Sequence, residues 1–153
     1  MHTQDEIVTY LGTHQSWLGF NVQALIPFLD FEHARSFLKD EVTAEEWEPT
    51  RLPLTEEGVL AEMREYMEFA WDKVENHRGI SANRNVEKME AWVWLLGRDD
   101  VLGRFLAAPY PQYGAPRLAQ LCRDLSFPIP DGPGLVNMIA GRPCHEGCEG
   151  CAA

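Results

Sequence analysis

The sequence predicts an all-α fold, a small helical bundle built around a long antiparallel helical hairpin. Apolar residues recur at spacings of three and four in two neighbouring stretches, residues 55–79 and 81–97, as they do along one face of a helix. No stretch shows the apolar–polar alternation of a half-buried strand. With 153 residues and 45% hydrophobic residues, the chain can also bury a core without the help of disulfides.

The first helix of the hairpin is predicted from the segment "TEEGVLAEMREYMEFAWDKVENHRG". Thr55 is a good N-cap residue, and acidic residues follow it in the first turn, where the helix dipole favours them. Gly79 is expected to end the helix, because glycine is common just past a helix C-terminus. One apolar stripe is formed by Val59, Met63, Tyr66, Met67, Ala70 and Val74.

The second helix is predicted from "SANRNVEKMEAWVWLLG", with Ser81 as its cap and Gly97 as its end. Trp92, Trp94 and Leu95 make its last turn apolar nearly all round, which predicts burial on several sides. The link "HRGIS" is short, so the two helices are expected to form an antiparallel hairpin.

Shorter helices are expected on both sides of the hairpin. They are predicted from "TQDEIVTYLG", "DFEHARSFLKD" with Asp30 as cap, "TAEEW", "VLGRFLAA", "RLAQLCRDL" and "LVNMIAG". The proline-rich "FPIPDGPG" is expected to be an extended connector, and "EPTRLP", residues 48–53, a linker. These features predict an acidic N-terminal helical subdomain at 1–50, a hairpin core at 51–143 and a cysteine-rich tail at 144–153 packed on that core.

The net charge of −11 is concentrated in the first half of the chain. Residues 1–76 hold 16 acidic and 5 basic residues, whereas residues 77–153 hold 8 of each. Such a field repels nucleic acid and attracts basic surfaces. The N-terminus lacks the pattern of a secretory signal and no apolar run is long enough to span a membrane, so we expect a cytoplasmic protein.

The tail "GRPCHEGCEGCAA" has the composition of a zinc site, since reduced cysteines clustered in a cytoplasmic protein favour metal binding over disulfides. Cys144, Cys148 and Cys151 are the predicted ligands. The fourth ligand is predicted to be Cys122 or, as the alternative, His145. A four-ligand site of this kind would be structural and would fix the tail to the bundle. The competing interpretation is a reduced tail without a metal.

The same spacing of three cysteines occurs in radical S-adenosylmethionine enzymes. That chemistry needs a large barrel after the motif, and only two residues follow Cys151. We therefore reject it. No phosphate loop, nucleophile elbow or Ser-His-Asp order is present, so no catalytic residue is predicted and a non-enzymatic role is expected.

Acidic residues form a stripe along the first helix of the hairpin. Few lysines stand four residues from these carboxylates to pair with them, so a row of carboxylates that mimics nucleic-acid phosphates is one interpretation and an ordinary solvated face is the other. A second acidic group lies near the predicted linker, beside a tryptophan suited to an interface. The predicted partner-binding residues are Glu62, Glu65, Asp72, Glu75, Glu45, Glu46 and Trp47.

The segment "HRGISANR" places polar and cationic side chains at a helix N-terminus, where anions bind well. A connecting loop with its caps explains the same residues. No glutamate precedes His77 by three residues, so the sequence does not favour the Glu-x-x-His metal site of a bundle core.

From about residue 55 to 151 the chain resembles small uncharacterised proteins encoded by bacteriophages and prophages. The stretches "EAWVWLLG" and "YPQYGAP" are the most specific part of this resemblance. It implies a bacterial cytoplasm during infection. In that setting we expect an interaction protein that inhibits a host defence complex, of the anti-CRISPR or anti-restriction type, through its acidic surface. The alternative is a zinc-containing accessory protein that binds nucleic acid through arginines of the second half: Arg78, Arg84, Arg98, Arg104, Arg117 and Arg142.

Overall fold

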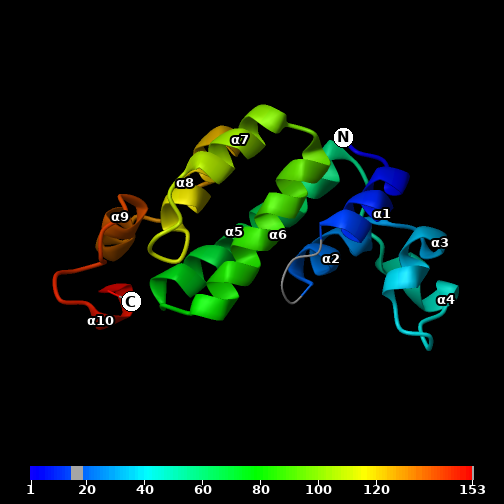
Figure 1. The fold of residues 1–153 in the computed structure, drawn as a ribbon, viewed down its shortest axis with the longest axis horizontal. Helices are drawn as coiled ribbons and strands as arrows, with labels where there is room; N and C mark the ends of the chain where they lie inside the picture. Colours follow the sequence, from blue (N-terminus) through cyan, green and yellow to red (C-terminus); the bar gives the residue numbers. More distant parts are fainter. Residues whose placement is uncertain (15–18, 153) are drawn as a thin grey trace. The chain divides into compact units, whose positions relative to one another are not determined.

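The computed structural model describes residues 1–14 and 19–152, and these residues confirm the all-α class. They form ten α-helices and three short 3-10 helices, and no strand. Figure 1 shows the course of the chain. The α-helices are α1 (Gln4–Thr13), α2 (Phe20–Leu25), α3 (Phe31–Ala34), α4 (Ala44–Trp47), α5 (Glu56–Glu75), α6 (Gly79–Leu96), α7 (Asp99–Ala107), α8 (Ala115–Leu125), α9 (Pro133–Ile139) and α10 (Glu149–Ala152).

Helices α5 and α6 form the predicted hairpin. The side-chain oxygen of Thr55 accepts a hydrogen bond of 3.0 Å from the backbone N–H of Gly58, so the predicted N-cap is confirmed. At the other end of the hairpin, Gly97 has a left-handed φ of 74° and ends α6 as expected.

The turn of the hairpin differs from the prediction. His77 ends α5: its φ is 57°, its N–H donates to the carbonyl of Val74, and the N–H of Arg78 donates to the carbonyl of Lys73. This is the Schellman pattern of a helix C-terminus, with a histidine where glycine is usual. Gly79 therefore starts α6 instead of ending α5, and the prediction that Ser81 caps the second helix is wrong.

The chain divides into two compact units, and each contains one part of the hairpin. Unit 1 consists of residues 1–63 and 87–98, and unit 2 of residues 64–86 and 99–153. The boundaries predicted at residues 50 and 143 rest on sequence composition. They remain a prediction.

In unit 1, tryptophans of α6 hold the N-terminal helices. The indole N–H of Trp92, which is 1% exposed, donates a 2.9 Å hydrogen bond to the carbonyl of Ala24. The ring of Trp94 stacks on Tyr10 at 3.9 Å and on His2 at 4.1 Å. The buried apolar side chains beneath them include Ile7, Leu11, Leu25, Phe28 and Leu29.

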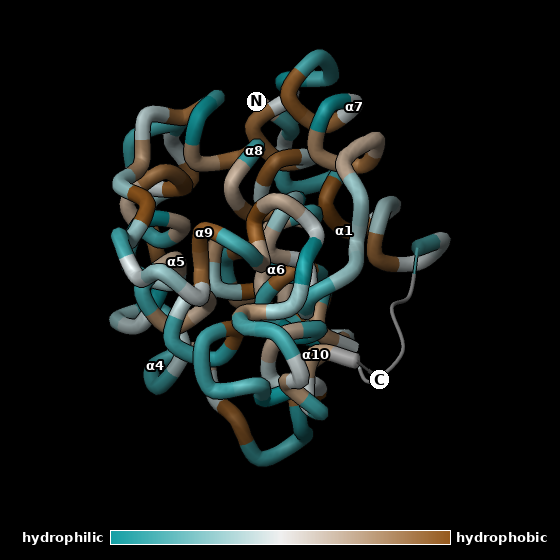
Figure 2. Tube along the Cα trace, turned by 90° about the vertical axis from the view of Figure 1, so that its left-hand side faces the viewer, coloured by the Kyte–Doolittle hydropathy of each residue, from teal (hydrophilic) through white to brown (hydrophobic). Residues whose placement is uncertain are grey.

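In unit 2, seven residues of α8 are buried, and Pro116 lies in its first turn as predicted. The guanidinium of Arg117 donates to the carbonyls of Leu106 and Ala108 at the end of α7, where the last carbonyls of a helix have no partner within the helix. Figure 2 shows how apolar stretches, in brown, alternate with hydrophilic ones, in teal, along the chain. Residues 127–132 form the expected extended connector between α8 and α9.

No helix within the described residues is both long and apolar enough to cross a membrane.

Candidate metal centre

The side chains of His77, Cys144, Cys148 and Cys151 converge in unit 2 to form a candidate metal site. Their ligand atoms all lie within 4.8 Å of one another. Figure 1 shows the same juxtaposition in the ribbon, where α10 (red) lies beside the turn between α5 and α6. The sequence predicted the three cysteines as one group; the histidine comes from a position 67 residues earlier in the chain than Cys144.

The distances fit one ion held by an imidazole nitrogen and three sulfurs. The Nε2 atom of His77 lies 3.7 Å from the Sγ of Cys144, 3.6 Å from that of Cys148 and 3.0 Å from that of Cys151. Metal–sulfur bonds of about 2.3 Å and metal–nitrogen bonds of about 2.0–2.1 Å at tetrahedral angles separate N and S by roughly 3.6 Å. Two of the three separations match this value, and the third is a thiol–imidazole hydrogen bond that a small shift of Cys151 would open.

His77 reaches the cysteines because it terminates α5. Its left-handed backbone turns the chain away from the helix axis, and histidine is among the few residues other than glycine enriched in that conformation. A non-glycine residue in this region costs about 1–3 kcal/mol, and such residues cluster at functional sites. The ring of His77 also meets the ring of Tyr113 edge to face, with centroids 5.4 Å apart.

The tail is attached to unit 2 on both sides of its cysteines. The side-chain amide of Asn137 donates a 2.9 Å hydrogen bond to the carbonyl of Cys144. The hydroxyl of Tyr113 donates to the carbonyl of Gly150. Gly147, with a φ of 82°, makes the turn that brings Cys148 to the start of α10.

Two glycines allow the close approach. A Cβ atom at Gly150 would lie 3.1 Å from the Cδ2 of His77, and a Cβ atom at Gly134 would lie 3.2 Å from the Cβ of Cys144. Both separations are tighter than ordinary van der Waals contact. A larger residue at either position would therefore require the ligand residue beside it to shift by a few tenths of an ångström.

Two thiols of the cluster have pKa values shifted in opposite directions. The backbone N–H of Cys151 and the thiol of Cys144 both donate to the sulfur of Cys148 and lower the pKa of Cys148. The same hydrogen bond, together with burial, raises the pKa of Cys144 to about 11. The lowered pKa makes Cys148 easier to deprotonate, and the thiolate is the form that binds metal.

The structure corrects the fourth ligand. Cys122 is fully buried on α8, where burial raises its pKa to about 11 and the indole of Trp71 contacts it; it does not belong to the cluster. The Nδ1 of His145 lies 3.2 Å from the sulfur of Cys144, but His145 is exposed and also outside the cluster. His77 was not predicted as a ligand, because a ligand on a distant turn forms no local spacing pattern with the cysteines. The sequence signal for it was the presence of a histidine in the turn after a long helix.

The predicted partner-binding residues are exposed or half-buried in the structure. On α5, Glu65, Asp72 and Glu75 are exposed and Glu62 is half-buried. Phe69, between them in the stripe, has 54% of its surface exposed. The acidic face predicted for this helix is therefore present as a surface.

In unit 1, Glu45 and Glu46 are exposed on α4, and Glu46 completes the cap of that helix by donating its N–H to the side chain of Thr43. Trp47 is half-buried, and its indole N–H donates a 2.9 Å hydrogen bond to the carbonyl of Leu29. This contact fixes the ring within unit 1. The binding role predicted for Trp47 stays a prediction.

Fold and site together define a small all-helical protein with a candidate His–Cys₃ metal site. No protein-family model, curated protein or solved structure matches the chain.

Proposed function

We propose that the protein is a non-enzymatic interaction protein whose C-terminal segment is fixed by zinc. One observation carries the metal half of this proposal: within unit 2, one imidazole from the turn after α5 and three thiols from the C-terminal segment converge. Thiolate and imidazole ligands in a set of four are the ligand set of structural zinc sites. A site filled by four protein side chains has no open position at which to activate water, so its role is to hold the tail against the turn of the hairpin.

Metal analysis tests this half directly. Protein purified without chelator is expected to contain stoichiometric zinc, and Co²⁺ in its place is expected to give the strong visible absorption of a tetrahedral thiolate site. A Cys122→Ala variant should keep both, since Cys122 lies outside the cluster. Absence of zinc from the wild-type protein, or loss of zinc in the Cys122→Ala variant, would contradict the proposal.

The second half concerns the partner. We propose that the acidic face of α5 binds a host protein in the bacterial cytoplasm and inhibits a nucleic-acid-binding defence complex of the anti-CRISPR or anti-restriction kind. Support comes from the exposure of Glu65, Asp72 and Glu75 beside an exposed aromatic ring, Phe69. An aromatic residue among carboxylates suits a basic protein surface, because it adds apolar contact to charge attraction.

Charge reversal tests this half. Substitution of Glu62, Glu65, Asp72 and Glu75 by lysine is expected to abolish capture of the partner from a phage-sensitive host while leaving the helical circular-dichroism signal intact. A matched control reverses four exposed acids elsewhere, at Glu32, Asp40, Asp99 and Glu146. Unchanged capture by the fourfold variant would refute the role of this face.

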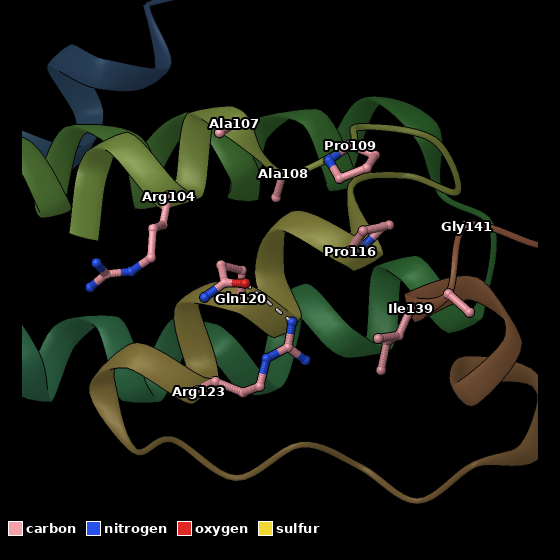
Figure 3. A pocket seen from close by; sticks show the side chains of 10 residues that line it. Arg104, Ala107, Ala108, Pro109, Pro116, Gln120, Arg123, Ile139 and Gly141 are labelled. Carbon is pink, nitrogen blue, oxygen red and sulfur yellow. Dashed lines mark hydrogen bonds between the residues drawn. The ribbon is translucent and has the colours of Figure 1, made fainter. Parts of the chain in front are cut away.

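The alternative function is a nucleic-acid-associated accessory protein, and the structure bears on its arginines. Arg104 is paired with Asp124 at 3.1 Å and Asp100 at 3.4 Å, and Arg117 caps the end of α7. Figure 3 shows Arg104 and Arg123 at the edge of a cavity in unit 2, with Arg123 hydrogen-bonded to Gln120. Arg98 lies 3.7 Å from Glu56 and Arg84 is half-buried, so the exposed Arg78 and Arg142 are the main support for this alternative. A mobility shift of duplex or single-stranded DNA at moderate salt would favour it over the acidic-face proposal.

A further inference from the structure

A groove runs along the part of α5 that belongs to unit 2. It has a volume of about 390 Å³ and lies between α5 and the connector that joins α8 to α9. Its apolar surface comes from Met67 and Trp71, which are 2% and 3% exposed, and from Ile129 on the connector. The buried residues form its floor and are fixed by the core, so the groove is part of the packed unit.

Carboxylates surround this apolar floor. Glu68, Asp72 and Glu75 all line the groove and are exposed. Lys73 lies 3.5 Å from Asp72 and partly offsets that charge. Arg64, the cation that lines the groove, has its guanidinium 5.2 Å from the centroid of the Phe127 ring, a cation–π contact that joins α5 to the connector. The groove therefore presents negative charge around an apolar centre.

The connector limits how a peptide could bind. Pro128 and Pro130 have no backbone N–H, so this extended segment cannot offer a continuous ladder of hydrogen bonds to an added strand. Recognition must then rest on side chains. An apolar side chain on the floor and cations against the three carboxylates would satisfy both parts of the lining.

We propose that this groove binds a basic segment of a partner protein, in which one or two apolar side chains stand between arginines or lysines. The proposal rests on the proposed function, whose acidic face shares Asp72 and Glu75 with the groove, and it adds Glu68, Trp71 and Ile129 as contact residues. It also names the partner's recognised element: a short cationic segment with an apolar centre.

The test uses the full-length protein and a fluorescein-labelled peptide with two arginines on each side of a leucine–phenylalanine pair. Fluorescence anisotropy is expected to show saturable binding that weakens as salt rises, because the charges are exposed to solvent. A peptide of equal charge with serine in place of both apolar residues should bind about tenfold more weakly. Equal binding of the two peptides would overturn the proposal, since it would show attraction by charge alone.

Two double variants with the same change in net charge locate the site. Glu68→Lys with Glu75→Lys should weaken binding about tenfold, through two lost attractions and two new repulsions. The control, Glu32→Lys with Glu41→Lys, alters exposed acids that do not line the groove and should change binding less than twofold. Equal losses in the two double variants would overturn the proposal.

A third variant, Ile129→Ser, alters the apolar lining without changing charge. It should weaken binding of the leucine–phenylalanine peptide severalfold and leave binding of the serine peptide unchanged. Equal effects on the two peptides would count against the groove. If the peptide fails to bind the wild-type protein while charge reversal on the acidic face still abolishes partner capture, the groove is refuted and the proposed function stands. If the peptide binds the wild-type protein but charge reversal on the acidic face leaves partner capture unchanged, the groove stands and the proposed function is refuted.

Discussion

At the scale of single residues, His77 combines a structural and a chemical role that can be separated. Its backbone ends α5 in the left-handed conformation, and its Nε2 faces three sulfurs. Asparagine tolerates the same backbone conformation but offers a poor ligand. Exchange of the side chain therefore removes the ligand and keeps the helix end.

We predict that His77→Asn lowers zinc affinity at least about a hundredfold, more than the roughly ten- to hundredfold loss typical when a group that only orients a ligand is removed. Helicity without metal should match that of the wild type. Competition with a chromogenic zinc chelator measures the affinity. His145→Asn is the matched control and should lose less than about threefold; if His77→Asn also loses less than about threefold, the assignment of His77 as the fourth ligand is wrong.

His33 in unit 1 gives a second prediction at this scale, on pH. Its ring nitrogens lie 2.8 Å from a carboxylate oxygen of Asp30 and 2.9 Å from one of Asp5. The hydrogen bond to Asp30, then that to Asp5, raises the pKa of His33. A raised pKa means that the imidazolium stabilises the folded state fully below about pH 6.5 and that this contribution is lost as pH rises through the folded-state value.

We therefore expect His33→Gln to lower the free energy of unfolding at pH 6 and to lower it less at pH 8.5, as measured by urea denaturation. The hydrogen bond from His33 also lowers the pKa of Asp30, so the benefit should shrink again in acid below the ordinary pKa of an aspartate. His14→Gln, an exposed control, should show no such dependence. A loss that is equal at both pH values would show that the ion pairs do not contribute.

At the scale of elements, α10 is placed by contacts as close as those of a core, although it has four residues. Gly150 lies against the ring of His77, and Tyr113 donates to its carbonyl. The helix is too short to be stable alone. Its position depends on these contacts and on the cysteines at its two ends.

Gly150→Ala tests this packing. The added Cβ, 3.1 Å from the His77 ring, should displace the imidazole and weaken zinc binding by about tenfold. Gly103→Ala in α7 is the matched control, because no atom lies within 4 Å of its Cβ position. That control should stabilise the protein by about 0.5–1 kcal/mol and leave zinc binding unchanged. Equal zinc affinity in the two variants would show that the ring can move away without cost.

Prediction from sequence succeeded for elements whose signals are local. The cap at Thr55, the end of α6 at Gly97 and the proline in the first turn of α8 each follow from one residue's effect on its own backbone. The end of α5 was predicted two residues too late. Gly79 is the residue type usual after a helix, but His77 has the left-handed conformation that ends α5. Residue preferences predict a glycine at a helix end and do not predict a histidine in its place.

At the scale of the whole molecule, the candidate site shows the same limit. Its three cysteines were predicted because they lie within eight residues of one another. Its histidine could not be predicted, since the contact joins the turn after α5 to the chain's last helix. Cys122 was favoured by sequence distance, but it faces the core of unit 2 and contacts Trp71. Sequence spacing identifies ligands that share a loop, whereas a ligand from another element is determined by packing.

The last prediction concerns the stability of the folded chain with and without metal. A ligand that binds only the folded state stabilises it by about 2.7 kcal/mol when its free concentration is a hundred times Kd. For a chain of this length that corresponds to roughly 5–10 °C in Tm. We expect a chelator to lower Tm by this amount. Hydrogen exchange should show the largest loss of protection at residues 144–152 and at the turn around His77. The His77→Asn variant should show no change in Tm on chelation. A wild-type Tm that ignores the chelator, or a variant that responds to it equally, would mean that the metal does not join the tail to the hairpin.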